Sequence, residues 1–205
     1  QNCANGINDA YRRVNSSDLT LLMSNRVITD ELLRSVEQHP AVKDMVVKEA
    51  IFVFDSKFGD VQDTNPWFLL RLTDEYSILN DRLTGYADET PALQKGELYL
   101  PQGIATKLGC GIGDTVKLNT IGGIEEFTVK GFVVEPTCGA MNMGLKQVFI
   151  SDEDFARLQA DAIGKSTEQK QADFRIIELY KADESHIPLL RRTRRLSTRS
   201  KPVLH

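Results

Sequence analysis

The order of apolar and polar positions predicts a chain that mixes strands and helices throughout. Short apolar runs rich in β-branched and aromatic residues predict strands. They cover residues 18–23, 42–54, 67–72, 96–100, 115–118, 127–134, 147–150 and 174–180. Apolar residues spaced three or four apart predict helices. These lie between Thr29 and Pro40, over residues 102–108, after Ser151, and over residues 184–195.

Two of the predicted helices begin with clear polar signals. Thr29 and Ser151 stand at N-cap positions, and acidic residues follow each of them in the first turn. A capping hydroxyl satisfies a free N–H group, and the carboxylates favour the positive end of the helix dipole. The residues expected to face inward are Leu32, Leu33 and Val36 in the first helix, and Phe155, Leu158 and Ala162 in the second.

Residues 96–136 carry the clearest turn signals. Gly109 is expected just after a helix end, where a left-handed backbone favours glycine. Gly113-Asp114 predicts a turn and Gly122-Gly123 a hairpin. Gly131, inside a predicted strand, is typical of a close approach. The segment is therefore predicted to be a compact β-rich unit with one short helix. Residues 56–66, 74–95 and 137–146, the last with Met141 and Met143, are predicted to be irregular.

These motifs, in this order, resemble the extracytoplasmic domain of ABC transporter permeases of the MacB/FtsX type. The motifs are GELYLP (96–101), IATKLG (104–109), GD (113–114), VKL (116–118), FTVKGFV (127–133) and VFISDEDFARL (148–158). The opening DLTLLM (18–23) and the helix after Thr29 also fit the beginning of that domain.

The resemblance implies an α+β fold with two lobes. Residues 1–76 and 172–205 would form an α/β porter-like lobe, and residues 77–171 an inserted β-rich lobe. We expect a hinge near residues 74–95 and 165–171.

The resemblance also implies a function without catalysis. The domain would lie outside the cell, between two membrane helices of the permease. It would couple the binding of a substrate or partner protein there to movement of those helices. ATP hydrolysis would reside on a separate subunit or domain, since the chain contains neither GxGxxG nor GxxxxGK[ST]. No cofactor and no catalytic or metal-binding residue is predicted. The partners would be the protein's own membrane helices, the ATP-binding subunit, and a peptide or protein outside the cell.

Composition and charge agree with a globular domain cut from a longer protein. Hydrophobic residues are 41% and charged residues 26% of the 205, which is ordinary globular usage. The net charge of -4 argues against general nucleic-acid binding. Residues 191–205 carry six basic residues and no acid. This end could touch anionic lipid, but we favour a solvated terminus. The sequence contains no apolar run of membrane length and no signal peptide, and its non-methionine start suggests an internal piece.

Candidate chemistry is sparse. Cys3, Cys110 and Cys138 show no metal spacing, and a Cys110–Cys138 bridge is left open. A hydrolase with a Cys or Ser nucleophile is a further hypothesis, but no GxSxG motif is present. The acids at 152–154 are better interpreted as helix-start charges than as a metal site. The acidic residues around Gly59 are Asp55, Asp60 and Asp63, and they lack the twelve-residue pattern of a calcium-binding loop. The histidines are His39, His186 and His205.

A second fold hypothesis is a small β-barrel that recognises a substrate, of the cradle-loop or double-psi kind. The strand, short helix and GD turn of residues 96–118 also resemble that class. Such a barrel requires a second, similar half. The sequence contains one copy of the GD-turn pattern, which favours the permease interpretation.

Overall fold

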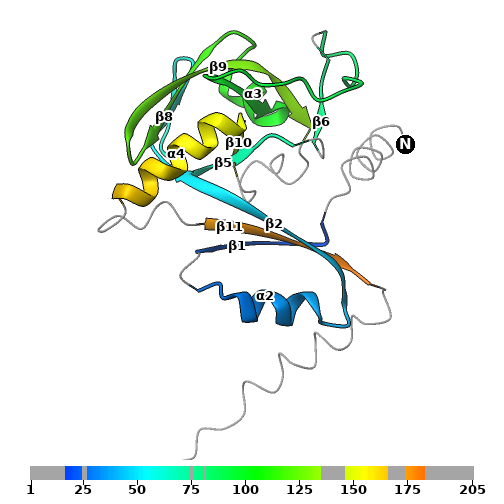
Figure 1. Ribbon diagram of the computed structural model, residues 1–205. Helices are drawn as coiled ribbons and strands as arrows, with labels where there is room; N and C mark the ends of the chain where they lie inside the picture. The colour runs from blue at the N-terminus through cyan, green and yellow to red at the C-terminus, as the bar shows by residue number, and fades with distance from the viewer. Residues whose placement is uncertain are drawn as a thin grey trace, which may run out of the picture. The chain divides into compact units, whose positions relative to one another are not determined.

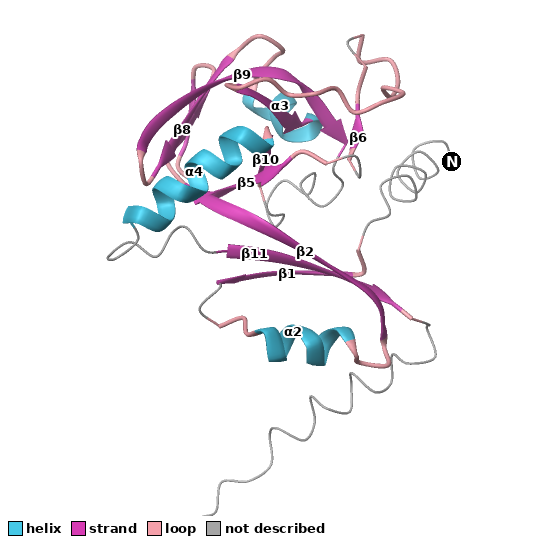
Figure 2. Ribbon diagram, viewed as in Figure 1, coloured by secondary structure: helices cyan, strands magenta, loops and turns pink. Residues whose placement is uncertain are grey.

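The computed structural model describes residues 17–24, 27–73, 76–80, 82–134, 146–165 and 174–182 (Figure 1), apart from the side chains of residues 162–165. Its fold class is α+β, as predicted, and Figure 2 shows the mixture of helices and strands. The elements are β1 (Leu19–Ser24), α2 (Asp30–Glu37), β2 (Val42–Val53), β3 (Ser56–Phe58), β4 (Val61–Asp63), β5 (Trp67–Arg71), β6 (Ser77–Ile78), β7 (Glu97–Pro101), α3 (Gln102–Leu108), β8 (Thr115–Thr120), β9 (Gly123–Val134), β10 (Gln147–Ile150), α4 (Asp152–Lys165) and β11 (Phe174–Lys181).

The chain divides into two compact units. Within the described residues, the smaller unit comprises the part from Ser17 to Val47 and the part from Ile176 onward, and the larger unit comprises the part from Lys48 to Arg175. Residues 48–76 thus pack with the middle of the chain, because β5 pairs in parallel with β10. The division into functional lobes at 76/77 and 171/172 stays a prediction.

The smaller unit is a three-stranded sheet with one helix. Its strand order is β1-β11-β2, and Figure 1 shows α2 running along one face. The predicted cap is confirmed, since the Thr29 hydroxyl accepts a hydrogen bond from the Leu32 N–H. The helix ends at Glu37, before Pro40, as expected. No residue of α2 is fully buried; Leu33 and Val36 are half-buried and Leu32 is exposed.

The larger unit contains a mixed sheet in the order β2-β5-β10-β7-β9-β8-β3-β4, with β6 pairing β9. The β5–β10 and β7–β9 pairs are parallel, and the other pairs with a known register are antiparallel. The order is open among the described strands, and one strand–helix–GD turn–strand unit, β7–α3–β8, occurs in them. The barrel hypothesis gains no support from this topology.

The core of the larger unit lies on both faces of its sheet. β5 from Trp67 to Leu70 and all of β10 are buried at every position, as expected for strands covered on both sides. On one face Trp67 packs against Phe58 with ring centroids 4.4 Å apart, and Phe155 of α4 joins the same cluster. On the other face Phe149 contacts Tyr76, again at 4.4 Å.

The turn signals of residues 96–136 are confirmed. Gly109 and Gly113 have φ values of 64° and 88°, in the left-handed region. The Gly122-Gly123 hairpin is present, and its returning strand starts at Gly123 rather than residue 127. Pairing begins at Thr120 with Gly123, so the strand extends through polar residues that the apolar pattern left out.

The prediction of an irregular segment at residues 56–66 is wrong. β3 and β4 form a hairpin there, and β3 also pairs with β8. Each strand has three residues, too few to show a period of two, and Gly59 at φ 57° makes the turn. Several predictions lie outside the described residues. They concern Cys3, Cys138, His186, His205, Met141, Met143, the helix at 184–195, the hinge residues after Lys165 and the basic end.

Candidate functional site

Of the three cysteines, Cys110 lies within the described residues. Cys110 is a free thiol and is buried after the end of α3. Burial raises its pKa to about 11, and the nearby Asp114 carboxylate adds to the increase. Because the thiolate is the nucleophile, burial and the Asp114 charge both disfavour the reactive form of Cys110. Of the candidate bases, His39 lies in the smaller unit, where its Nδ1 accepts a hydrogen bond from the Ala41 N–H.

Neither a metal-binding cluster nor a membrane-spanning helix is found in the described part of the chain. No three His, Cys, Asp or Glu side chains gather there as metal ligands. None of the helices in these residues is long and apolar enough to cross a membrane.

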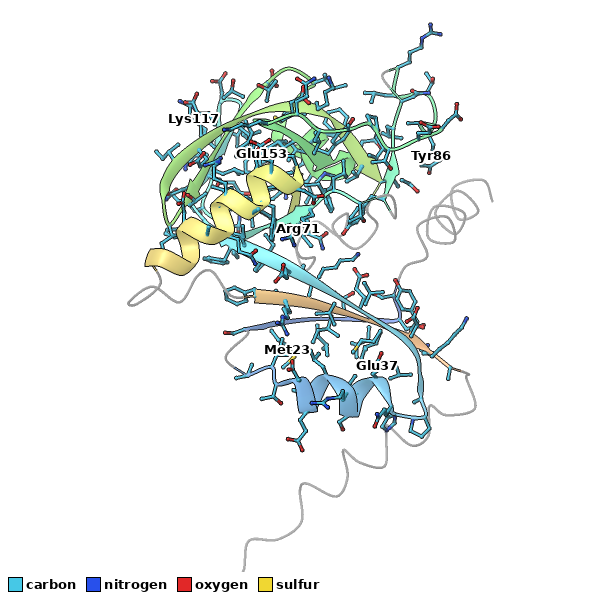
Figure 3. The ribbon with its side chains drawn as sticks, in the orientation of Figure 1. Met23, Glu37, Arg71, Tyr86, Lys117 and Glu153 are labelled. Carbon is cyan, nitrogen blue, oxygen red and sulfur yellow. The ribbon has the colours of Figure 1, made fainter. Side chains whose placement is uncertain are left out.

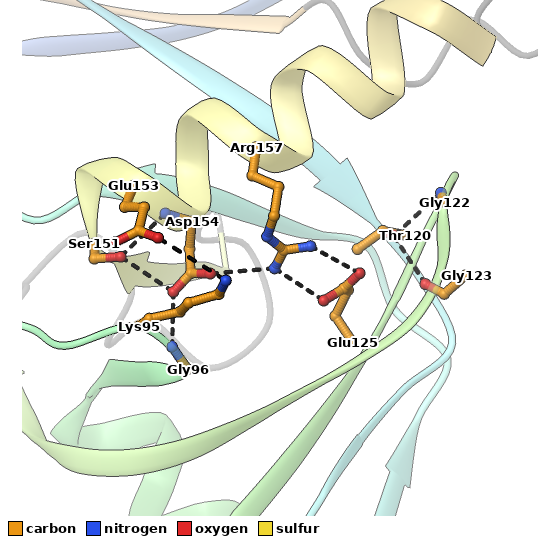
Figure 4. Close-up of polar contacts among 10 residues, drawn as sticks. All are labelled: Lys95, Gly96, Thr120, Gly122, Gly123, Glu125, Ser151, Glu153, Asp154 and Arg157. Carbon is orange, nitrogen blue, oxygen red and sulfur yellow. Dashed lines mark hydrogen bonds and ion pairs between the residues drawn. The ribbon is translucent and has the colours of Figure 1, made fainter.

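The acidic start of α4 is a helix cap and an anchor (Figure 4). Ser151 Oγ accepts a hydrogen bond from the Asp154 N–H at 3.1 Å, which closes the first turn. The buried Asp154 carboxylate in turn accepts from the Gly96 N–H at 2.8 Å, at the start of β7. The helix-start interpretation is confirmed, and the contact with Gly96 is an addition that the sequence did not suggest.

Arg157 ties α4 to β9. Its guanidinium donates two hydrogen bonds to the Glu125 carboxylate, at 3.1 and 2.9 Å, and one to Asp154 at 3.1 Å (Figure 4). The hydrogen bonds to Glu125 raise the pKa of Arg157 further above its usual value. Paired N–H donors that match a carboxylate give a strong and directional contact. Arg157 therefore fixes the rotation and position of α4 on the larger unit.

A second arginine holds the beginning of α4. Arg71, at the end of β5, stacks its guanidinium 3.9 Å from the ring centroid of Phe155 and pairs with Glu49 at 2.8 Å. Figure 3 labels Arg71 beside α4. Sequence reasoning missed both arginines, because a single basic residue in a helix or strand gives no signal of its partner.

A buried carboxylate fixes the β3–β4 hairpin. Asp63 accepts hydrogen bonds from Lys146 Nζ at 2.8 Å, from Trp67 Nε1 at 3.2 Å, and from both nitrogens of Asn65. Burial alone would raise its pKa, but the hydrogen bonds from Lys146 and Asn65 outweigh burial and lower the pKa to about 2. Asp63 is therefore an ionised group whose oxygens are engaged by Lys146, Trp67 and Asn65.

A cavity open to the surface of the smaller unit is lined by residues of α2 and of its sheet. It has a volume of about 440 Å³. Its lining consists of Asp18, Leu19, Ser35, Val36, His39, Ala41, Val42, Leu179, Tyr180 and Lys181. Figure 3 shows the side chains of this region, with Met23 labelled on β1 and Glu37 on α2. Sequence reasoning missed the cavity, because its lining joins residues 18–19 and 35–42 to residues 179–181, which lie far from them in the chain.

Two of the residues that line this cavity, Asp18 and Lys181, form an ion pair. The Asp18 carboxylate accepts a hydrogen bond from the Lys181 N–H at 2.8 Å and pairs with Lys181 Nζ at 3.2 Å. The backbone hydrogen bond from Lys181 is the main cause of the lowered pKa of Asp18. Both groups are partly exposed, so the pair adds little stability, but it closes β1 onto β11.

The larger unit has a smaller and more polar cavity of about 260 Å³. Tyr76, Tyr86, Asp88 and Glu89 are among its lining residues. We assign this cavity no role.

The chain was compared with protein-family models, curated protein sequences and solved structures. No protein-family model and no curated protein sequence matches the chain. Among solved structures, it is similar to the periplasmic region of MacB from Actinobacillus actinomycetemcomitans, with 11% identity, a TM-score of 0.39, and coverage of 94% of this chain and 88% of that one. It is also similar to a domain from Porphyromonas gingivalis described as part of a permease, with 11% identity, a TM-score of 0.36, and coverage of 80% and 68%.

Proposed function

We propose that the chain is a non-catalytic, extracytoplasmic domain of an ABC transporter permease. It couples the binding of a substrate or partner protein outside the cell to movement of the permease's membrane helices. ATP is hydrolysed by a separate ATP-binding subunit or domain.

The observation that carries the proposal is the order of elements between residues 96 and 158. The motifs that resemble the family fold as β7, α3, a GD turn, the β8–β9 hairpin, β10 and α4. Each motif falls on the element that the resemblance implies, and Gly109 and Gly113 take the left-handed backbone that their places require. A chance match of isolated letters would not produce a consistent series of elements.

The packing of the larger unit supports a mechanical role. The Asp154, Arg157 and Glu125 contacts join α4 to β7 and β9 through charged hydrogen bonds. Transmission of movement requires bodies that keep their internal shape while their surroundings move. An anchored helix over a sheet whose strands β5 and β10 are buried on both faces meets that requirement.

The location is tested by labelling one engineered cysteine in cells. The full-length gene product carries Lys107→Cys, an exposed position on α3, in a background with Cys3→Ser and Cys138→Ser. Cells are treated with a membrane-impermeant maleimide after their outer barrier has been permeabilised, while the cytoplasmic membrane is kept intact. We expect Lys107→Cys to react without lysis of the cytoplasmic membrane. The parent background, which retains the buried Cys110, is the control and should stay unlabelled until it is denatured.

Labelling only after the cytoplasmic membrane is broken would contradict the extracytoplasmic location. The same preparation tests the permease context, since the proposal requires the full-length product to pellet with membranes and to copurify with an ATP-binding protein. A soluble product with neither property would overturn the proposal.

A further inference from the structure

We propose that the cavity of the smaller unit binds a small, predominantly apolar molecule whose polar end lies beside the Asp18–Lys181 ion pair. The inference comes from the cavity itself and does not depend on the permease function.

The side chains of the lining are suited to hydrocarbon. Leu19, Val36, Val42 and Leu179 contribute branched apolar groups from β1, α2, β2 and β11, and Ala41 adds a methyl group. Ligand sites are typically concave and mostly apolar, with few polar groups that orient the ligand. The cavity has this composition.

The polar groups of the lining are largely engaged within the protein. Asp18 is bound to Lys181 through both backbone and side-chain contacts, and His39 Nδ1 accepts from the Ala41 N–H. Tyr180 also has a partner. A strongly polar ligand would lose its water and find few free partners there, which is costly. The buried part of the ligand is therefore apolar.

The size of the cavity sets the size of the ligand. Apolar cavities of about 150 Å³ accept benzene. The volume of about 440 Å³ is near three times as large, so two or three fused or linked rings, or an equivalent aliphatic chain, would fill it. The lower end of the usual range for ligand sites is about 300 Å³.

Helices α2 and α4 differ in how completely they bury side chains against their sheets. In the larger unit α4 buries Phe155 and Leu158 completely against its sheet. In the smaller unit no residue of α2 is fully buried, and Val36 faces the cavity. Protein interiors are normally close-packed. A bound apolar molecule would supply the contacts that α2 lacks.

Binding is measured with N-phenyl-1-naphthylamine, a neutral three-ring probe whose fluorescence increases when it leaves water. The 205-residue chain is titrated with the probe at constant protein concentration. We expect saturable binding of one probe per chain. Ligand-to-protein nuclear Overhauser effects should reach the methyl groups of Val36 and Val42. A probe that binds without contact to these methyl groups would overturn the proposal.

Two variants fill the cavity, and a third is their matched control. Ala41→Phe and Val36→Phe place a ring into the space, whereas Glu37→Phe adds the same ring on α2 at an exposed position outside the lining. Variants are compared only where circular dichroism shows native helix and strand signal. We expect at least a tenfold rise in Kd for either filling variant, and less than a twofold change for Glu37→Phe. Equal affinity in all three would overturn the assignment.

Competition decides the class of ligand. Decanol, a neutral amphiphile, should displace the probe at concentrations below its solubility limit. An acetylated and amidated trileucine peptide should not. Displacement by the peptide alone would show that the cavity takes peptide side chains, and would overturn the proposal of a small apolar molecule.

Discussion

At the residue scale, Gly131 is a position where the structure leaves no room for a side chain. A Cβ atom at this position would lie 2.6 Å from Cε1 of Tyr99, its partner across the parallel β7–β9 pair. Tyr99 is buried, so its ring has no free space to enter. We expect Gly131→Ala to lower the free energy of unfolding by about 1–3 kcal/mol, measured by urea denaturation. Gly122→Ala is the control, since its Cβ would meet nothing closer than 3.5 Å.

Also at the residue scale, we predict that the contribution of Asp63 to folding stability depends on pH. Its pKa in the folded state is lowered from 3.8 to about 2. A depressed pKa adds stability above the unfolded value, and that stability is lost as pH falls through the folded value. Asp63→Asn should therefore cost about 2 kcal/mol near neutral pH, and the difference from wild type should shrink as pH falls from 4 to 2.

The measurement for Asp63 is a series of denaturation curves between pH 2 and 7. Asp60→Asn, at an exposed position in the same hairpin, should change stability by less than about 0.5 kcal/mol. A cost for Asp63→Asn that stays constant over the whole pH series would show that the carboxylate charge is not the cause.

At the element scale, Arg157 distinguishes a partly buried ionic anchor from an exposed surface pair. Removing its guanidinium leaves the buried Asp154 and the half-buried Glu125 without their cation. We expect Arg157→Met to cost about 2–3 kcal/mol, below the range for fully buried pairs because Arg157 is partly exposed. Lys117→Met is the control, since the Lys117–Glu126 pair on the β8–β9 hairpin is exposed and should contribute less than about 1 kcal/mol. Equal costs would contradict the anchoring role.

Most elements could be predicted because their signals are local. Thr29 and Ser151 satisfy N–H groups within one turn, and Gly109 relieves backbone strain at its own position. The β3–β4 hairpin could not be predicted, because its stability comes from pairing with β8, about 60 residues later. The apolar and polar pattern of a three-residue strand does not indicate that β8 is its partner.

At the scale of the whole molecule, the sequence could not predict which strands lie together outside the β8–β9 hairpin. The parallel pairing of Phe68 with Gln147 joins residues almost 80 positions apart. Residues 67–70 of β5 and 148–150 of β10 are continuous apolar runs. Such runs indicate burial, but they do not indicate which strand lies beside them. The cavity was unpredictable for the same reason, since Leu19, Val36 and Leu179 meet only after the sheet has formed. The sequence therefore predicted most of the elements and a family resemblance, but not the β3–β4 hairpin or the candidate site.

The two compact units should differ in local stability. In the smaller unit, three described residues, Ile28, Ile176 and Ile177, are fully buried, whereas the larger unit holds the extended core. Regions with fewer buried apolar contacts open at lower free energy. We expect the amides of α2 and β1 to exchange with solvent deuterium through openings at least about 2 kcal/mol less costly than those that expose β7, β9 and β10. Native-state hydrogen exchange across a series of low denaturant concentrations measures both values. Equal opening free energies in α2 and β9 would show that the chain unfolds as one cooperative body. The opposite order would show that the cavity-bearing unit is the more stable one, and the link between buried contacts and local stability would fail for this protein.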